Sequence, residues 1–282
     1  MSFEPRLTPA RPDLAAAHLE GEVEAARFVP GRPHVVGIPI LPLTHGPDPE
    51  GELASQLLLG ESFTIYDTDP ATGLAWGQAA DGYVGWVPQA GLEREAAAGT
   101  PHRVSALFTH VYPEPQFKCR PVEALPFRAE VGVTGEAGDF LELAIGGYAP
   151  RQHLAADWPD EPDPVTWSER FLNVAYLWGG RSPAGLDCSA LVQLGLQAAG
   201  VAARRDADLQ MASLGRKLRK GSRLRRGDLV FWTGHVGWMQ DETRLLHANI
   251  FHMAVASEPL EAAVARIDAA GGGKPLQVRR LG

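Results

Sequence analysis

The sequence has few cysteines and no long apolar segment. Only two cysteines, Cys119 and Cys188, occur among its 282 residues, which excludes a disulfide scaffold and a four-thiolate zinc site. No stretch is apolar over the length needed to span a bilayer. Residues 1–21 contain acidic residues and prolines instead of the basic, apolar and small-residue parts of a secretory signal. On these grounds we expect a cytoplasmic protein.

Basic charge is also scarce relative to acidic charge. The chain has 26 Lys and Arg against 34 Asp and Glu, a formal net charge of -8, which argues against non-specific binding to nucleic acid or to an anionic membrane. A small polar substrate remains compatible with this charge. The length and a hydrophobic content of 45% are sufficient for two or more domains with ordinary cores.

The pattern along the chain changes several times before residue 165. Residues 1–34 are predicted to be a lead-in segment, in which Asp13 caps a short helix over residues 14–19. Residues 35–92 consist of short apolar runs separated by Gly, Pro and Asp, which predicts a small all-β barrel. Residues 104–154 predict a second barrel, and whether it repeats the first stays open. The acidic, Pro-rich residues 157–164 are predicted to form a linker.

From residue 165 to residue 282 the pattern indicates an α+β domain. Helical spacing joins Trp167 to Phe171, Leu172 and Ala175, and a second helix is expected to run from Cys188 to Gly200. Three short apolar segments follow, at residues 227–232, 235–239 and 244–248, and these are expected to form an antiparallel sheet packed on the helices.

The chemistry centres on Cys188, which follows a glycine-rich turn and is predicted to start a helix. Helix amides and the helix dipole are expected to stabilise its thiolate. His235 and His247 lie on predicted neighbouring strands joined by a short turn at residues 241–243, which would set the two imidazoles side by side. A thiolate that can meet an imidazole indicates a cysteine nucleophile at Cys188. Cys119 has no such context and is expected to be inert.

The motifs around these residues resemble those of the NlpC-type family of cell-wall cysteine peptidases. The matching motifs are Tyr-x-Trp-Gly-Gly at 176–180, Asp-Cys-Ser at 187–189, Gly-Asp-Leu-Val-Phe at 227–231, His-Val-Gly at 235–237 and His-Ala at 247–248. Ala175 and Ala190 replace the family's usual Pro and Gly. The resemblance implies a papain-like fold, with Cys188 as nucleophile, His235 as general base and His247 as the orienting residue.

The same resemblance implies a set of substrate-binding residues. Tyr176 is similar to an active-site tyrosine, and Asp187 and Ser189 to residues that line the groove. Arg204-Arg205-Asp206 resembles a family segment that holds the amino-terminal end of the substrate, although Ala207 replaces its usual Ser. Asp187 and Asp206 would supply negative charge for an ammonium group.

Residues 56–65, Trp76 and residues 81–87 resemble a bacterial Src-homology-3 (SH3)-like domain, and Tyr83 is the candidate for a barrel tyrosine that grips the substrate amine. Family members with such barrels are similar to γ-D-glutamyl-L-diamino acid endopeptidases of murein recycling. The resemblance thus implies cleavage of murein peptides with a free amino-terminal L-Ala, with no metal or organic cofactor and no nucleic acid or membrane partner. Two alternatives stay open: a papain-like amidase or acyltransferase with another substrate, and a non-enzymatic wall-binding protein built on barrels.

Overall fold

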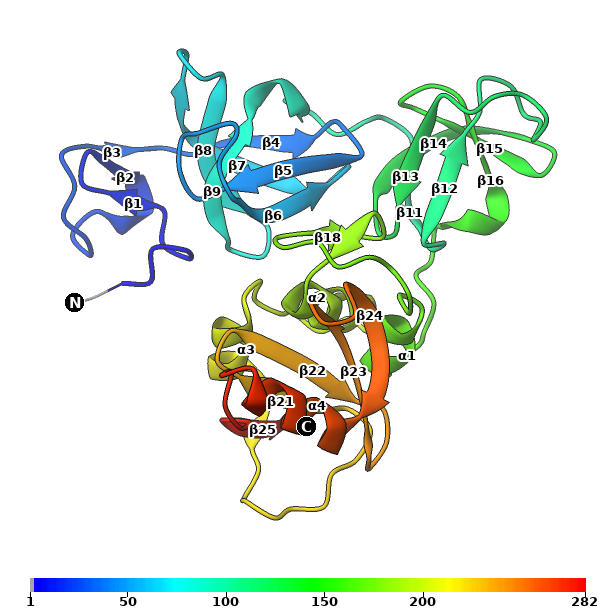
Figure 1. The fold of residues 1–282 in the computed structure, drawn as a ribbon. Helices are drawn as coiled ribbons and strands as arrows, with labels where there is room; N and C mark the ends of the chain where they lie inside the picture. The colour runs from blue at the N-terminus through cyan, green and yellow to red at the C-terminus, as the bar shows by residue number, and fades with distance from the viewer. Residues whose placement is uncertain (1–2) are drawn as a thin grey trace. The chain divides into compact units, whose positions relative to one another are not determined.

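The computed structural model describes residues 3–282, and the chain divides into two compact units between Pro159 and Asp160. This boundary falls inside the predicted linker at residues 157–164, where the backbone from 158 to 163 is irregular. Among the described residues, no helix has the length and apolar character needed to cross a membrane. Figure 1 shows the elements of each unit along the chain.

The lead-in segment forms a small sheet of its own, and the helix predicted over residues 14–19 is wrong. The sheet has the order β1-β2-β3, and η1 is a single 3₁₀ turn. Leu14 lies in β2, between an antiparallel and a parallel neighbour, and is completely buried. Asp13 binds Arg11 instead of capping a helix. The elements are β1 Ala10–Arg11, β2 Leu14–Ala16, η1 Ala17–Leu19 and β3 Phe28–Val29.

The first barrel is a seven-stranded antiparallel sheet. Its order is β10-β4-β7-β8-β9-β5-β6, and one apolar cluster includes Leu74, Trp76, Val84 and Trp86. Its elements are β4 Arg32–Val36, β5 Ile40–Thr44, β6 Leu53–Leu58, β7 Ser62–Asp69, β8 Leu74–Ala79, β9 Val84–Pro88, η2 Gln89–Gly91 and β10 Leu92–Glu93. The predicted start at residue 35 comes three residues after the first strand begins.

The second barrel repeats this strand order. In each barrel the first strand pairs with the last strand and with the first strand of a three-stranded meander, and a 3₁₀ turn precedes the last strand. A hairpin lies between the first strand and the meander in the sequence. It joins the sheet through β5 and β9 in the first barrel and forms a two-stranded sheet of its own in the second. The elements are β11 Thr100–Val104, β12 Phe108–Val111, β13 Glu123–Pro126, β14 Glu130–Ala137, β15 Phe140–Leu143, β16 Tyr148–Pro150, η3 Arg151–His153 and β17 Leu154–Ala155. Its core is aliphatic, whereas Trp76 and Trp86 of the first barrel form an apolar cluster with Leu14 of the lead-in segment.

The carboxy-terminal unit is built on a six-stranded antiparallel sheet with the order β20-β25-β21-β22-β23-β24. Helix α4 packs on one face through Ala263, and α2 lies against β22 and β23 (Figure 1). The strands are β18 Arg181–Ser182, β19 Gly185–Leu186, β20 Arg216–Lys217, β21 Asp228–Trp232, β22 His235–Met239, β23 Arg244–Asn249, β24 Ala254–Pro259 and β25 Gln277–Arg280. The helices are α1 Pro164–Glu169, α2 Cys188–Ala198, α3 Ala207–Ser213 and α4 Leu260–Ala269.

Helix α1 is shorter than its apolar spacing predicted. It ends at Glu169, and Ala175 instead forms a β-bridge with Ala254. The positive φ of 69° at Asn173 takes the chain out of the helical path before that bridge. The turn thus brings Tyr176 alongside Leu186, immediately before α2.

Candidate active site

Cys188 is the first residue of α2, and its position is fixed from both sides. Asp187 caps the helix by accepting a hydrogen bond from the Ala190 amide at 2.8 Å. The Cys188 Sγ lies 3.9 Å from the carbonyl oxygen of Gly234, the residue before His235. The thiol is therefore placed where the helix start meets the beginning of β22.

The Trp178-Gly-Gly turn holds Asp187 through its backbone. The amide of Gly179 donates to Asp187 Oδ2 at 3.1 Å, and its φ of 71° lies in the left-handed region that favours glycine. A Cβ at Gly180 would come within 2.4 Å of the Gly185 carbonyl oxygen. This glycine pair therefore permits the close backbone packing beneath the nucleophile.

Arg205 forms a buried ion pair with Asp187, a contact that the sequence reasoning missed. Its side chain is 1% exposed, and its two terminal nitrogens donate to the Asp187 carboxylate at 2.9 and 2.6 Å. The same guanidinium donates to Ser189 Oγ at 2.8 Å and to the Gly180 carbonyl at 3.2 Å. Arg205 is therefore committed to contacts within the chain. The Asp187 charge predicted to meet a substrate ammonium is paired with it.

His235 and His247 lie together as their strands predicted. His235 Nε2 is 2.8 Å from His247 Nδ1, and the ring centroids are 5.0 Å apart. The turn between the strands is held by Asp241 Oδ1, which accepts from the Thr243 and Arg244 amides. Because Nε2 of His235 is occupied by His247, Nδ1 is the nitrogen left for the thiol.

Gly237 provides the room that His247 occupies. A Cβ at Gly237 would lie 3.0 Å from His247 Cβ and 2.9 Å from Leu245 Cδ1. Alternation along β22 places His235, Gly237 and Met239 on one face, and Met239 packs against the α4 side of the sheet. The Gly of the His-Val-Gly motif thus lets the second imidazole approach the first.

We expected the helix start to stabilise the Cys188 thiolate, and this prediction is wrong for the site without substrate. Burial, and then the negative charge of Asp187, raise the pKa of Cys188 to about 12, and these effects outweigh the hydrogen bonds from the backbone amides of Val236 and Ser189. Burial and repulsion from His247 lower the pKa of His235 to about 3. The thiol of Cys188 and the imidazole of His235 are therefore both neutral at rest, and the proton must move as the sulfur attacks.

Tyr176 lies beside this pair and keeps its proton. Its backbone amide donates to the Met253 carbonyl at 2.9 Å. Burial, and then the charges of Cys188 and Asp187, raise the pKa of its hydroxyl. A neutral phenol is a hydrogen-bond donor, as a group facing a substrate carbonyl would need to be.

The structure does not test the remaining predicted substrate contacts. Asp206 occupies the N-cap position of α3. Tyr83 is 2% exposed, and its ring centroid lies 6.0 Å from that of His45. Tyr83 and Cys188 belong to different units, so the barrel contact stays a prediction.

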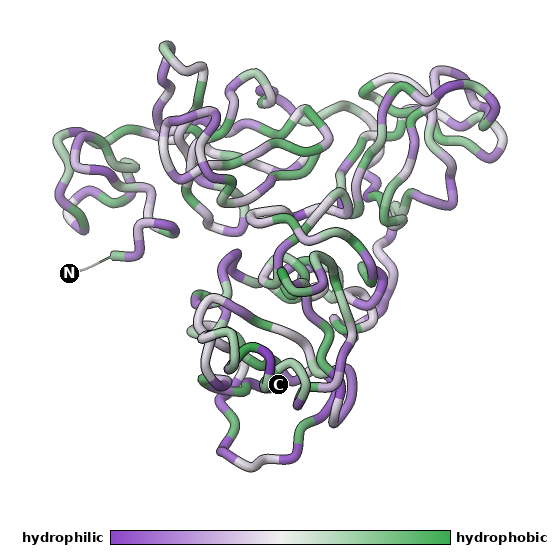
Figure 2. Tube along the Cα trace, viewed as in Figure 1, coloured by the Kyte–Doolittle hydropathy of each residue, from purple (hydrophilic) through white to green (hydrophobic). Residues whose placement is uncertain are grey.

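His252 does not form a metal site with His247. Its Nδ1 lies 3.0 Å from Asn249 Oδ1, and residues 3–282 contain no group of three or more His, Cys, Asp or Glu placed to hold an ion. The basic residues 216–226 are largely exposed, and Figure 2 shows a mostly hydrophilic loop before β21. Within this run, Arg226 binds Asp163 and Glu169 of the same unit.

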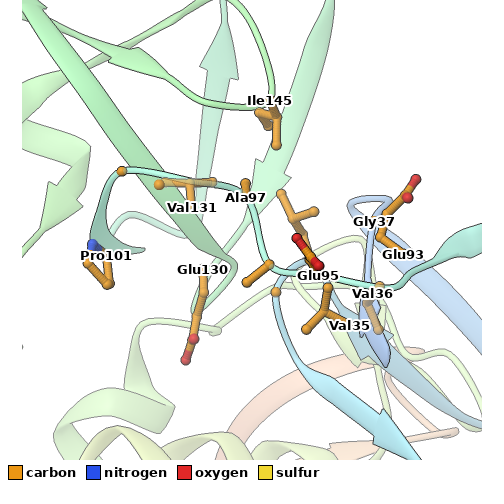
Figure 3. Close-up of a pocket in the computed structure, with 15 residues that line it drawn as sticks. Val35, Val36, Gly37, Glu93, Glu95, Ala97, Pro101, Glu130, Val131 and Ile145 are labelled. Carbon is orange, nitrogen blue, oxygen red and sulfur yellow. The ribbon is translucent and has the colours of Figure 1, made fainter. Parts of the chain in front are cut away.

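A cavity of about 430 Å³ in the amino-terminal unit offers different chemistry (Figure 3). The first barrel contributes Glu93, the segment joining the barrels contributes Glu95 and Ala97, and the second barrel contributes Glu130 and Ile145. None of the residues that line this cavity is a Cys, Ser, Thr, His or Lys. It thus lacks a thiol, a hydroxyl and an imidazole, and Cys188 remains the candidate centre for cysteine chemistry.

Comparison with known proteins places both kinds of domain. Residues 173–266 match the NlpC/P60 family model, and residues 43–92 match the model of the bacterial dipeptidyl-peptidase SH3 domain. Dipeptidyl-peptidase 6 of Lysinibacillus sphaericus is 35% identical over 129 residues, which cover 44% of this chain and 45% of that protein. The matched region thus spans less than half of the relative's length.

Two solved structures share the fold. An NlpC/P60 family protein from Bacillus cereus aligns over 88% of this chain and 99% of its own, with a TM-score of 0.69 at 18% identity. An NlpC/P60 endopeptidase from Photobacterium damselae aligns over 89% and 72%, with a TM-score of 0.59 at 12% identity. The chain therefore carries an NlpC/P60 domain, centred on Cys188, behind a bacterial SH3 domain.

Proposed function

We propose that this chain is a cysteine endopeptidase that hydrolyses the bond between the γ-carboxyl of D-Glu and the diamino acid in murein peptides with a free amino-terminal L-Ala. The observation that supports the proposal is that Cys188 starts a helix and its Sγ contacts the carbonyl of Gly234, the residue before His235, which in turn contacts His247. A thiol next to an imidazole that a second polar group orients is the arrangement of a cysteine nucleophile.

Support for the substrate comes from the relatives. A matched family model and a 35% identical relative both carry the name dipeptidyl-peptidase. In its ordinary meaning, that activity releases a dipeptide from a free amino terminus, and L-Ala-γ-D-Glu is such a dipeptide. Peptides with a free L-Ala amine are those that recycling would supply, so a cytoplasmic role in murein peptide recycling is part of the proposal.

The proposed reaction begins from the neutral pair. As Sγ of Cys188 attacks the γ-carbonyl, Nδ1 of His235 takes the thiol proton, and the amide at the start of α2 is available to the developing oxyanion because first-turn amides have no intrahelical acceptor. His235 then gives its proton to the departing amine, leaving a thioester on Cys188. Water, deprotonated by His235, hydrolyses the thioester and regenerates the thiol.

The test compares L-Ala-γ-D-Glu-meso-diaminopimelate with its N-acetylated form, with products identified by mass spectrometry. We expect release of the diamino acid from the free-amine peptide alone, loss of activity in Cys188→Ala, and full activity in the matched Cys119→Ala control, since Cys119 lies outside the site. Absence of cleavage by the wild type, or equal cleavage by the Cys188→Ala variant, would contradict the proposal. Equal cleavage of both peptides would favour an amidase of broader specificity.

A further inference from the structure

The carboxylate of Glu258 contacts His247 on the side away from His235. His247 Nε2 lies 2.8 Å from Glu258 Oε1, and His247 itself is completely buried. We infer that Glu258 is a positioning residue, which sets the proton arrangement of both histidines by acting through His247. The inference rests on the proposed function, because it assigns a role within the same site.

The sheet register places Glu258 for this contact. Strand β24 pairs with β23 so that Ala256 lies opposite His247 and Glu258 opposite Leu245. Because side chains alternate between the two faces of a strand, Glu258 and His247 project on the same face and are diagonal neighbours. The contact thus follows from strand pairing and does not depend on a loop.

Arg266 keeps the Glu258 carboxylate ionised. Its guanidinium forms an ion pair with Glu258 Oε1 and lies 4.3 Å from the centroid of the Phe251 ring. Hydrogen bonding with His247 and the charge of Arg266 lower the pKa of Glu258 despite its partial burial. An ionised carboxylate can only accept a hydrogen bond. The proton of the Glu258–His247 contact therefore belongs to His247 Nε2.

The proton on His247 Nε2 determines the direction of the other hydrogen bonds in the series. A neutral imidazole that carries its proton on Nε2 has a lone pair on Nδ1, so His247 Nδ1 accepts from His235 Nε2 across the 2.8 Å contact. His235 then has its own lone pair on Nδ1, the nitrogen that the proposed reaction assigns to the thiol proton. Without Glu258, the reversed arrangement becomes available, with a proton on His235 Nδ1. That form cannot take the thiol proton.

The first experiment compares Glu258→Gln with Glu261→Gln, a matched change of an exposed residue in the first turn of α4. The amide introduced by Glu258→Gln can donate as well as accept, so this substitution removes the constraint with little change in shape. We expect kcat for the proposed peptide to fall about a hundredfold in Glu258→Gln, with KM within about twofold, since Glu258 is proposed to act on protons and not on substrate. Glu261→Gln should match the wild type.

A double-mutant cycle separates positioning from a merely structural role. In a His247→Asn background, Glu258→Gln should cause no further loss of kcat, because the residue through which Glu258 acts is already gone. Independent losses that multiply, or an unchanged kcat in the single Glu258→Gln variant, would overturn the inference.

Two measurements require no substrate and keep the inference separate from the proposed function. Alkylation by iodoacetamide, quantified by peptide mass spectrometry, should be about tenfold slower at Cys188 in Glu258→Gln and unchanged at Cys119 of the same molecule. In the wild type, ring ¹⁵N chemical shifts should show both histidines protonated on Nε2. A proton on Nδ1 of either neutral ring would refute the inference even if the variants did not fold. If the murein peptide is not cleaved but both measurements agree, the substrate assignment fails and the role of Glu258 stands.

Discussion

The two sides of Cys188 are built from charged groups arranged in opposite ways. On the helix side, Asp187 and Arg205 form a closed pair in which each charge is matched inside the protein. On the sheet side, hydrogen bonds connect Glu258 to His247 and His247 to His235, and the series ends at His235, the residue after the Gly234 carbonyl that the Cys188 sulfur contacts. The Asp187–Arg205 ion pair, here called the closed pair, can fix the backbone around it because both of its charges are matched. The hydrogen-bonded series Glu258–His247–His235, here called the open chain, can move a proton because its last nitrogen has no partner within the series.

The largest effect is expected at the open end of the chain. His235→Gln removes the group that takes the thiol proton, and kcat/KM for the proposed peptide should fall about 10⁴-fold. The thermal unfolding midpoint should change little, since His235 is half-buried and Gln can also form a hydrogen bond with His247. Steady-state kinetics with a calorimetric control measures both. Retention of more than a tenth of the activity would show that another group accepts the proton.

The next effect is expected on stability, from the closed pair. Arg205→Leu leaves the buried Asp187 carboxylate without its partner, which should lower the free energy of unfolding by about 3–5 kcal/mol. Arg226→Leu is the matched control, because its ion pairs are about one-third exposed and its loss should cost about 1 kcal/mol or less. Urea unfolding monitored by tryptophan fluorescence compares the two. Equal losses would mean that Asp187 is well solvated.

Low pH should lower the free energy of unfolding through the protonation of His235. The pKa of His235 is lowered from 6.5 to about 3 in the folded protein, so the unfolded state binds more protons between these values. Stability is therefore fully present above pH 6.5 and is lost as the pH falls towards 3, by up to about 1.4 kcal/mol per pH unit for one proton. Urea unfolding at pH 7, 5.5 and 4.5 should show a shallower fall for His235→Gln. Parallel curves would place the titration elsewhere.

The smallest effect is expected at Ser189, which the resemblance placed in the substrate groove. Its hydroxyl donates to Asp187 and accepts from Arg205, so Ser189→Ala should lower the free energy of unfolding by about 1 kcal/mol. If the residue belongs only to the closed pair, KM should change less than about threefold. A tenfold rise in KM at unchanged stability would instead support the predicted substrate contact.

Much of the site was predictable because its parts are local in sequence. Asp187 precedes an apolar helix and caps it, and His235 and His247 lie on strands separated by a turn that Asp241 organises. The order of barrels and α+β domain also follows from short apolar runs and turn residues. The helical extent of α1 was overestimated because spacing alone does not show that Ala175 pairs with Ala254.

The missed features depend on contacts between distant residues. Nothing near Arg205 signals that its guanidinium lies on Asp187, 18 residues earlier, and Glu258 reaches His247 only through the register of β23 and β24. The state of the thiol was mispredicted for a related reason. A helix start favours an anion, but the burial that opposes it comes from the whole domain.

The repeated strand order of the two barrels has a consequence for their folding during synthesis. Two neighbours with the same topology run the risk of exchanging hairpins before either has closed. Here Trp76 and Trp86, on the β8–β9 hairpin of the first barrel, pack with Leu14 of the lead-in segment, whereas the matching hairpin of the second barrel contributes Leu141, Leu143 and Ala149 to an aliphatic core. A β8–β9 hairpin inserted into the second barrel would leave these tryptophans without Leu14, so the divergence of side chains disfavours the exchange.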